Sequence, residues 1–317
     1  MSGRLGLSLA VGRYDLHDAL IRGAVVPQGV DLTVLVYRSA ERHWRMLRNA
    51  EFDICEVGMG SFLPIYDAGD APLVAIPAFP HRRFRHGYVF VRADAEIEEP
   101  GQLDGRRVGL FNWQATVGLW ARGILQDEHG VDLSSIDWVT QAEEEVPLDH
   151  VGRFRIRPSG GTPVVDLLLA GQLDALILPD VPEQIDRGDP RIRRLFPDPK
   201  QADIDYYART GCFPIMHTVV LRRSLHEANP WLAAELLIAL RESKDRAFSE
   251  MHDPRRVSLA WLIEARDEQE RILGADPWAY GLEPNRRPLE TMLRYAQEQG
   301  LTRRGLSPEE LFVPSTL

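Results

Sequence analysis

Short apolar runs alternate with segments of helical periodicity over the first two thirds of the chain, and this alternation limits the folds available to it. Leu5–Val11, residues 30–37 and residues 52–57 have the length and composition of strands. A helix is predicted at 40–50, with Trp44 and Leu47 on its apolar side. Strands and helices that alternate with short connections are typical of α/β layers, in which helices cover both faces of a sheet.

The chain has 317 residues, which favours two domains over one. The pattern predicts a discontinuous first lobe, residues 1–91 and 206–317, and a second lobe inserted at 92–205. Residues 213–222 are predicted to form one strand of the first lobe, and 186–205 a loop. We therefore expect a two-lobed α/β fold with C-terminal helices packed on the first lobe. Its ligand is expected in a cleft between the lobes, beyond the carboxyl ends of the strands.

The charge and the cysteines exclude several kinds of function. Lys and Arg number 37 against 47 Asp and Glu, a formal net charge of −10, so binding to nucleic acid or to an anionic membrane is not expected. No apolar segment approaches the length of a membrane span, and the apolar run near the N-terminus lacks the flanks of a signal peptide. Cys55 and Cys212 form no metal-spaced cluster. We expect a cytoplasmic protein with buried free thiols and no structural metal.

The densest basic cluster is HRRFRH at residues 81–86, directly after a strand predicted at 73–78. In an acidic protein such a cluster is a candidate anion site, because an arginine guanidinium can hold a carboxylate through two parallel hydrogen bonds. A solvated loop paired with surface acids would explain the cluster equally well. Its position beside the predicted hinge favours a binding or catalytic function for Arg82, Arg85 and His86.

Three predicted helix N-termini follow strand ends, at residues 58–61, 112–116 and 159–162. Backbone amides and the helix dipole favour a carboxylate at such a terminus. Each turn alone is a weak signal, because every α/β protein has such turns, but together they supply candidate binding residues. These are Ser61, which is predicted to cap its helix, and Asn112, Gln114, Thr116, Ser159 and Gly160.

Three titratable side chains are candidates for proton transfer. His217 lies in a predicted strand, and His86 is predicted to share a strand face with Tyr88 and Phe90; a histidine at either place can act as a general acid near neutral pH. A satisfied core histidine is the alternative for both. Glu56, at a strand end, is either a general base or a carboxylate paired with an arginine. The acidic run at 143–145 is predicted to be a solvated turn.

Several stretches, in order along nearly the whole chain, resemble the 4,5-dihydroxyphthalate decarboxylase family. The most specific are AIPAFPHRRFRH at 75–86 and RTGCFPIMH at 209–217; EFDICEVGMGSF at 51–62 and DPWAYGLEPNRRPLE at 276–290 add to them. That family resembles type II periplasmic binding proteins in fold. The resemblance implies non-oxidative decarboxylation of a hydroxylated aromatic dicarboxylic acid, in the namesake case 4,5-dihydroxyphthalate to protocatechuate.

For this reaction, we assign hypothetical roles to the candidate residues. Either His86 or His217 would deliver a proton to the ring, and Glu56 or the other histidine would take the phenolic proton. Arg82 and Arg85 would hold the carboxylates, together with the residues at the helix N-termini. No organic cofactor is implied, although a divalent cation on the catechol oxygens is compatible with the sequence.

The segment EVGMGS at 56–61 is less serine-rich than in the family, so the ring substitution pattern of the substrate is open. Two other functions are compatible with the same fold. A solute receptor or sensor would bind an aromatic acid without turnover, and another enzyme of this fold, such as those of menaquinone or thiamine-precursor synthesis, would act on a different substrate. The expected partner is a small aromatic carboxylate. A homo-oligomer is compatible with Trp261, Trp278 and Tyr295, which are predicted to be exposed.

Overall fold

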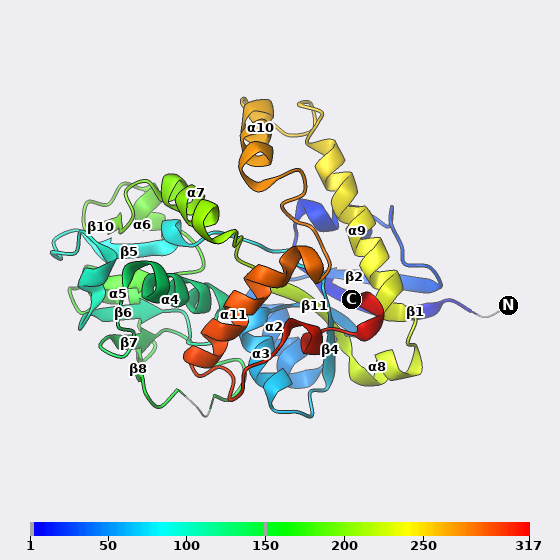
Figure 1. The fold of residues 1–317 in the computed structure, drawn as a ribbon, viewed down its shortest axis with the longest axis horizontal. Helices are drawn as coiled ribbons and strands as arrows, with labels where there is room; N and C mark the ends of the chain where they lie inside the picture. Colours follow the sequence, from blue (N-terminus) through cyan, green and yellow to red (C-terminus); the bar gives the residue numbers. More distant parts are fainter. Residues whose placement is uncertain (1–2, 149–150) are drawn as a thin grey trace. The chain divides into compact units, whose positions relative to one another are not determined.

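The computed structural model describes residues 3–148 and 151–317, which divide into two units (Figure 1). The first unit comprises Met1–Arg82, Ile215–Glu290 and Leu306–Leu317, and the second comprises Arg83–Pro214 and Thr291–Gly305. The second unit is thus inserted into the first, with a further short segment added near the C-terminus. Relative to the predicted boundaries, residues 83–91, 206–214 and 291–305 belong to the second unit.

The first unit is built on a five-stranded sheet with the order β2-β1-β3-β11-β4. Its strands are β1 (Leu5–Val11), β2 (Val30–Val36), β3 (Ile54–Gly58), β4 (Leu73–Ile76) and β11 (His217–Arg222). β1 pairs in parallel with β2 and β3, whereas β11 runs antiparallel to both β3 and β4. The first residue of β11 therefore lies beside the last residue of β3, and His217 is paired with Gly58.

The first unit also contains a set of helical segments. They are η1 (Asp15–His17), α1 (Asp18–Ile21), α2 (Ser39–Asn49), α3 (Met59–Asp67), α8 (Arg223–Ala228), α9 (Leu232–Glu250), α10 (Leu262–Leu273), η4 (Glu283–Asn285), the first residues of α11 (Arg286–Glu298), α12 (Pro308–Leu311) and η5 (Pro314–Thr316). The buried side of α2 consists of Arg42, His43, Met46 and Leu47, while Trp44 is 44% exposed. The helix therefore turns two ionisable side chains towards the interior, and the prediction of Trp44 on the buried side is wrong.

The second unit is built on a six-stranded sheet with the order β10-β5-β9-β6-β7-β8. Its strands are β5 (Val89–Arg92), β6 (Arg107–Leu110), β7 (Asp137–Thr140), β8 (Arg155–Pro158), β9 (Ala175–Ile177) and β10 (Ile192–Arg194). Its helical segments are η2 (His86–Tyr88), η3 (Pro100–Leu103), α4 (Thr116–His129), α5 (Val164–Leu169), α6 (Glu183–Asp186), α7 (Pro199–Thr210) and most of α11. Phe90, Val139, Leu168 and Leu176 form its core. The predicted α/β class is confirmed in both units.

Several local predictions are wrong. Residues 186–205 are not a loop, because they contain β10 and the start of α7, whose first turn is formed by Pro199 and capped by the Asp198 side chain. β11 begins at His217, and of the preceding residues Ile215 forms only an isolated bridge with Arg82. α3 begins directly after Gly58, so Ser61 lies within the helix and does not cap it.

Two further predictions concern exposure and strand faces. His86 opens a 3-10 turn, so it does not share a strand face with Phe90. Tyr295 is buried, because its ring packs against Trp120 at 5.7 Å and its hydroxyl donates to Asp127 at 2.9 Å, whereas Trp261 is 72% exposed as expected. Within the described ranges, the helices lack the combination of length and apolar character that spanning a membrane requires.

Candidate functional site

The first unit contains a fully buried charged cluster around Glu56. Oε1 of this carboxylate lies 2.7 Å from the Arg42 guanidinium and 2.5 Å from Nδ1 of His217. Its other oxygen accepts a hydrogen bond of 2.8 Å from the backbone amide of Gly12. Arg42 also donates to the backbone carbonyls of Glu56 (3.0 Å) and Tyr37 (3.1 Å). Every oxygen of the carboxylate is therefore engaged, and His217 is held by its Nδ1 side.

The electrostatics of this cluster keep Glu56 ionised. Burial opposes the charged form of Glu56, but Arg42 and the hydrogen bond with His217 outweigh burial and hold the pKa of the carboxyl well below its ordinary value. A carboxylate in this state stays negative across the physiological pH range. It can orient an imidazole and stabilise its protonated form, but it has little tendency to accept a proton itself.

Two histidines beside this cluster are buried and neutral. Burial lowers the pKa of His17, whose Nδ1 lies 3.2 Å from the carbonyl of Gly12. Burial, followed by the neighbouring His217, holds the pKa of His43 well below its ordinary value. The His43 ring meets the His217 ring edge to face, with 4.8 Å between the ring centroids. Both residues are thus packing neighbours of the charged groups and not sources of charge.

An aromatic pair lies on another side of His217. The ring of His81 is 4.6 Å from that of His217, with an interplanar angle of 68°, and it stacks on Tyr14 at 5.6 Å. Burial and then Glu56 raise the pKa of Tyr14, so its phenol stays protonated. Its hydroxyl accepts a hydrogen bond of 3.4 Å from Arg42.

The sheet topology explains why these residues meet. The carboxyl ends of β1, β3 and β4 lie at the same end of the sheet, and β11 begins there because it runs in the opposite direction. Tyr14 and His81 follow β1 and β4, Glu56 is near the end of β3, and His217 opens β11. Ligands of α/β sheets bind beyond the carboxyl ends of the strands, which is this end of the sheet. The cluster therefore has the position of a functional site as well as its chemistry.

Two other predicted residues of the first unit are buried. The Arg82 guanidinium donates to the side-chain oxygen of Asn285 and to the carbonyl of Ala279 at 3.3 Å, and it lies 5.6 Å from the Phe79 ring. Ser61 is 3% exposed in the first turn of α3, the helix that follows β3. The structure thus brings Glu56 and His217 into direct contact, while Arg82 is bonded to the segment around residues 279–285.

In the second unit, His86 forms its own pair with an acid. Its Nδ1 lies 2.6 Å from Oδ1 of Asp203 in α7, and its ring packs against Phe196 at 4.9 Å. Arg85 is 3% exposed, and its guanidinium lies 5.1 Å from the ring of Tyr88. Burial, with a smaller contribution from Arg83, lowers the pKa of Arg85 to about 9, which leaves it charged at neutral pH.

The turn at 112–116 already binds an anion from the chain itself. The Glu144 carboxylate accepts hydrogen bonds from the backbone amides of Trp113 (2.7 Å) and Gln114 (3.0 Å) and from the Gln114 side chain (2.8 Å). The Asn112 side chain accepts from the amide of Ala115 at 2.8 Å. The prediction of a solvated turn at 143–145 is therefore wrong for Glu144, which holds the N-terminus of α4 in place. Thr116 is the first residue of α4 and is buried.

The last two predicted residues follow β8. Ser159 is half-buried, and its amide donates to the carbonyl of Thr140 at 2.8 Å. Gly160 is exposed and has φ 69°, a conformation that favours glycine. Both belong to the turn between β8 and α5.

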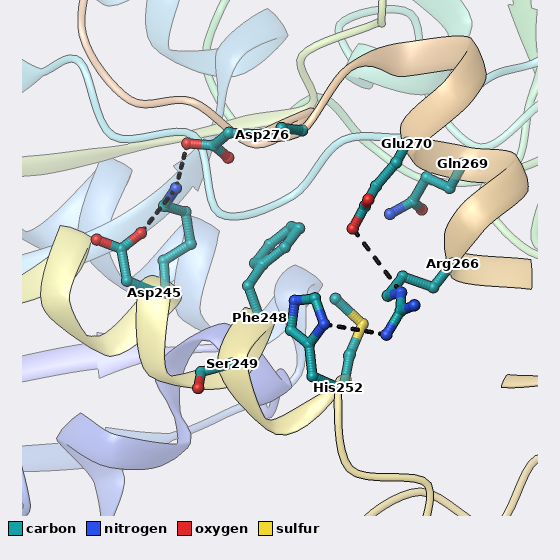
Figure 2. Close-up of a pocket in the computed structure, with 11 residues that line it drawn as sticks. Asp245, Phe248, Ser249, His252, Arg266, Gln269, Glu270 and Asp276 are labelled. Atoms are coloured by element: carbon teal, nitrogen blue, oxygen red, sulfur yellow. Dashed lines mark hydrogen bonds and ion pairs between the residues drawn. The ribbon is translucent and has the colours of Figure 1, made fainter. Parts of the chain in front are cut away.

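A separate pocket of about 340 Å³ lies between α9 and α10 of the first unit, and Figure 2 shows its charged lining. Lys244 binds Asp276 at 2.5 Å and Asp245 at 3.0 Å, and Arg266 lies 3.0 Å from Nδ1 of His252. The charged side chains that line the pocket form ion pairs with one another. None of the predicted site residues is among the lining residues.

The sequence prediction missed Tyr14, His17, Arg42 and His43. Tyr14 had a usable signal, since it follows the first strand as the other candidates follow theirs. Arg42 and His43 lie on a helix whose buried side carries them in place of Trp44, and the apolar spacing pointed to the wrong side. Among the described residues, no group of three or more His, Cys, Asp or Glu side chains is arranged to hold a metal ion.

The two buried histidines predict a loss of stability in mild acid. Because burial lowers the pKa of His17 and of His43 in the folded protein, each binds a proton more readily when unfolded, so the stability is fully present above about pH 6.5 and falls below it. Each contributes up to about 1.4 kcal/mol per pH unit to the slope. Urea unfolding between pH 7 and 5 measures this slope, and His43→Leu should reduce it by one proton. An unchanged slope in that variant would contradict the assignment of a neutral, buried His43.

Comparison with known proteins places this fold in a class. A family model described as an ABC transporter phosphonate periplasmic substrate-binding protein matches residues 15–247. The solved structure of the periplasmic sulfonate-binding protein SsuA from Methylobacillus flagellatus KT is similar, with a TM-score of 0.60, 16% identity, and coverage of 99% of this chain and 93% of that one. The fold is that of the periplasmic substrate-binding proteins, and the expected fold class is confirmed.

Two curated relatives define the family more narrowly, since both are named 4,5-dihydroxyphthalate decarboxylase. The protein from Comamonas testosteroni is 36% identical over 323 residues and covers 99% of this chain and 98% of its own. The protein from Pseudomonas putida is 34% identical over 64% of this chain and 82% of its own. The chain belongs to the 4,5-dihydroxyphthalate decarboxylase family and shares the fold of the substrate-binding proteins. The resemblance seen in the sequence is therefore confirmed.

Proposed function

We propose that this protein is a carboxy-lyase that decarboxylates a hydroxylated aromatic dicarboxylic acid such as 4,5-dihydroxyphthalate, without oxidation, to give protocatechuate and CO₂. Membership of the decarboxylase family, shared over 99% of the chain, is the observation that carries the proposal. The buried Glu56–His217 pair supports it, because ring protonation requires a positioned proton donor.

The reaction replaces a carboxylate by hydrogen. Each hydroxyl of 4,5-dihydroxyphthalate is para to one carboxylate, so its ionisation raises the electron density on the ring carbon that bears that carboxylate. A proton donor forms the new C–H bond at this carbon. The C–C bond to the carboxylate then breaks, its electron pair returns to the ring, and CO₂ leaves. The net change is the uptake of one proton and the release of one CO₂.

His217 is the proton donor in this proposal. Because its Nδ1 is held by Glu56, Nε2 is the nitrogen that would exchange a proton with the substrate. The buried carboxylate fixes the orientation of the ring and stabilises its protonated form. Glu56 keeps its own charge, so the phenolic proton needs a different acceptor. The His86–Asp203 pair of the second unit is the other candidate acid.

Arg85 is the group best suited to hold a carboxylate of the substrate. A buried guanidinium gains more from a carboxylate than an exposed one does, because the charge has lost its hydration. Arg82 is a second candidate. The polar residues Ser61, Asn112, Gln114, Thr116, Ser159 and Gly160 stay predicted contacts, with Gln114 already bound to Glu144.

Arg85→Gln is expected to raise KM for 4,5-dihydroxyphthalate by roughly 10- to 100-fold, with a smaller change in kcat, since a hydrogen bond to a charged group contributes about 1.5–3 kcal/mol. Steady-state kinetics of the purified variant measure both constants. The matched control is Arg83→Gln, because Arg83 is an exposed arginine of the same segment. Equal effects at the two positions would argue against a specific role for Arg85.

The proposal also covers the cofactor, the binding partner and the cellular location of the protein. The hydroxyl groups of the substrate supply the electron density, so no organic cofactor is needed, and activity measured with and without a chelator tests a divalent cation. The net charge of −10 supports a small-molecule partner in place of nucleic acid or membrane. The buried free thiols of Cys55 and Cys212 support a reducing, cytoplasmic location.

Product analysis with 4,5-dihydroxyphthalate in D₂O tests the proposed function. The expected result is one CO₂ per substrate and protocatechuate with one deuterium at the ring carbon that lost its carboxylate. Calorimetry on the same sample measures binding. Binding followed by recovery of unaltered ligand would overturn the proposal in favour of a binding protein, and the absence of both binding and turnover would reject this substrate.

A further inference from the structure

We propose that His81 is a second catalytic group of the first unit, the base that takes the phenolic proton while His217 protonates the ring. This inference rests on the proposed decarboxylation and adds a residue to it. It also assigns a function to the first residue of the basic segment 81–86, of which the sequence singled out only Arg82, Arg85 and His86.

The backbone holds His81 and His217 next to each other. The carbonyl of His81 accepts hydrogen bonds from the amides of Met216 (2.9 Å) and His217 (3.3 Å). The two imidazoles come from segments more than 130 residues apart, and their ring centroids are 4.6 Å apart. Main-chain hydrogen bonds therefore set the spacing of the pair at the point where β11 begins.

The surroundings of the two rings differ in a way that separates an acid from a base. The ionised Glu56 is bonded to His217 and stabilises a proton on that ring. His81 packs on Tyr14 instead. The two rings are in contact, so a protonated His217 disfavours a second positive charge on the imidazole of His81. Pairs of titratable groups whose environments differ in this way mark acid and base assignments.

The other groups that face His81 do not compete for its role. The phenol of Tyr14 stays protonated, since burial and Glu56 raise its pKa. His43, which interacts electrostatically with both His81 and His217, is kept neutral by burial. Arg42 is occupied by Glu56. His81 is half-buried, whereas His17 and His43 are buried, so of these three imidazoles it is the most exposed.

The spacing suits a single aromatic ring. In the substrate, the hydroxyl oxygen and the ring carbon para to it lie on opposite sides of one ring, and the centroids of the two imidazoles are 4.6 Å apart. One ring can therefore present its hydroxyl to His81 and its para carbon to His217. Holding both reacting atoms against fixed groups also removes much of the entropic cost of the reaction.

The proton transfers balance. His81 accepts the phenolic proton as the O–H bond breaks, and the oxygen lone pair moves towards the para carbon. His217 gives its Nε2 proton to that carbon, and CO₂ leaves as described above. The phenol of the product regains its proton from His81, and His217 regains one from water. One proton is consumed for each CO₂ released.

The test compares His81→Gln with His217→Gln over a range of pH, with 4,5-dihydroxyphthalate as substrate. At pH 7 we expect His81→Gln to lower kcat about 10²- to 10³-fold, within the usual range for a general base, with little change in KM. The defect should shrink as the pH approaches the pKa of the phenol, because an ionised hydroxyl needs no base. The defect of His217→Gln should not shrink. The matched control is His226→Gln in α8, outside the cluster, which should retain full activity.

A ring-fluorinated substrate with a more acidic phenol provides a second measurement, and it should also reduce the defect of His81→Gln. A defect that is constant in pH and in phenol acidity would overturn the role of His81 as a base and leave it a packing residue. If His81→Gln does not fold, the wild-type pH profile decides: the acidic limb of kcat/KM should weaken with the fluorinated substrate, and an unchanged limb would overturn the proposal. If the proposed function itself is wrong, the wild-type protein will produce no CO₂ from this substrate, which distinguishes that outcome from a wrong role for His81.

Discussion

His217→Gln lowers kcat for 4,5-dihydroxyphthalate by about 10²- to 10⁴-fold, the range expected for loss of a positioned general acid, while the dissociation constant of the substrate changes little. Glutamine keeps a polar side chain of similar length beside Glu56 but cannot carry a proton to the ring. CO₂ release measures the rate, and calorimetry with the slowly turned-over variant measures binding.

Two companion variants define what this result means. Glu56→Gln should lose part of the activity, because it removes the charge that stabilises the protonated His217 while leaving the imidazole in place. The control His226→Gln changes a histidine of α8 and should leave kcat unaltered. A His217→Gln protein with near-normal kcat would transfer the role of acid to the His86–Asp203 pair, which His86→Gln would then expose.

Arg42→Met is expected to lower the free energy of unfolding by about 3–5 kcal/mol, because it leaves the buried carboxylate of Glu56 without its counter-charge. Arg42 is fully buried, so water cannot replace the lost interaction. Denaturant unfolding of the purified variant measures the effect. The variant should also lose activity in proportion to the displacement of His217, which shares the same carboxylate oxygen.

The same helix provides the control. Arg45 of α2 pairs with Glu41 and Glu51 at the surface, and Arg45→Met should change stability far less, since solvent and salt already screen exposed pairs. Replacing both buried partners, Arg42→Met with Glu56→Leu, should restore most of the lost stability, because an apolar pair needs no compensation. A double variant as unstable as Arg42→Met alone would show that the loss comes from packing and not from the unpaired charge.

The sequence named individual candidate residues but not the contacts between them. The sequence identified Glu56 as a carboxylate at a strand end and His217 as a histidine in a strand, but 161 positions separate them and their 2.5 Å contact depends on strand register. That register follows from β11 entering the sheet antiparallel between β3 and β4. Local patterns carry no information about which distant strand fills a central position.

The buried side of α2 was missed for a different reason. Hydrophobic spacing assigns Trp44 to the interior because it assumes that apolar side chains are buried. Here the helix buries Arg42 and His43 instead, since Glu56 supplies the compensating charge for Arg42 from another element. A buried charged cluster of this kind contradicts the local pattern, and this contradiction appears only when the partners are seen together.

At the turn 112–116, the sequence indicated the kind of group that binds but not its identity. Its amides were correctly expected to attract a carboxylate, but the carboxylate bound there belongs to Glu144. The physical preference was correctly inferred, whereas the identity of the anion depended on a loop 30 residues away. Sequence reasoning therefore predicted the fold class and the polar strand ends, and could not predict which polar groups pair within the chain.

The central position of β11 has a consequence for synthesis on the ribosome. β4 pairs in the sheet with β11, which comes after the inserted segment 83–214 and therefore more than a hundred residues after β4 along the chain. A nascent chain therefore carries β3 and β4 with open edges while residues 83–214 emerge, and such edges invite pairing with other chains. The contact between Glu56 and His217 forms only when β11 enters the sheet, so we expect fragments that end before β11 to lack this pair.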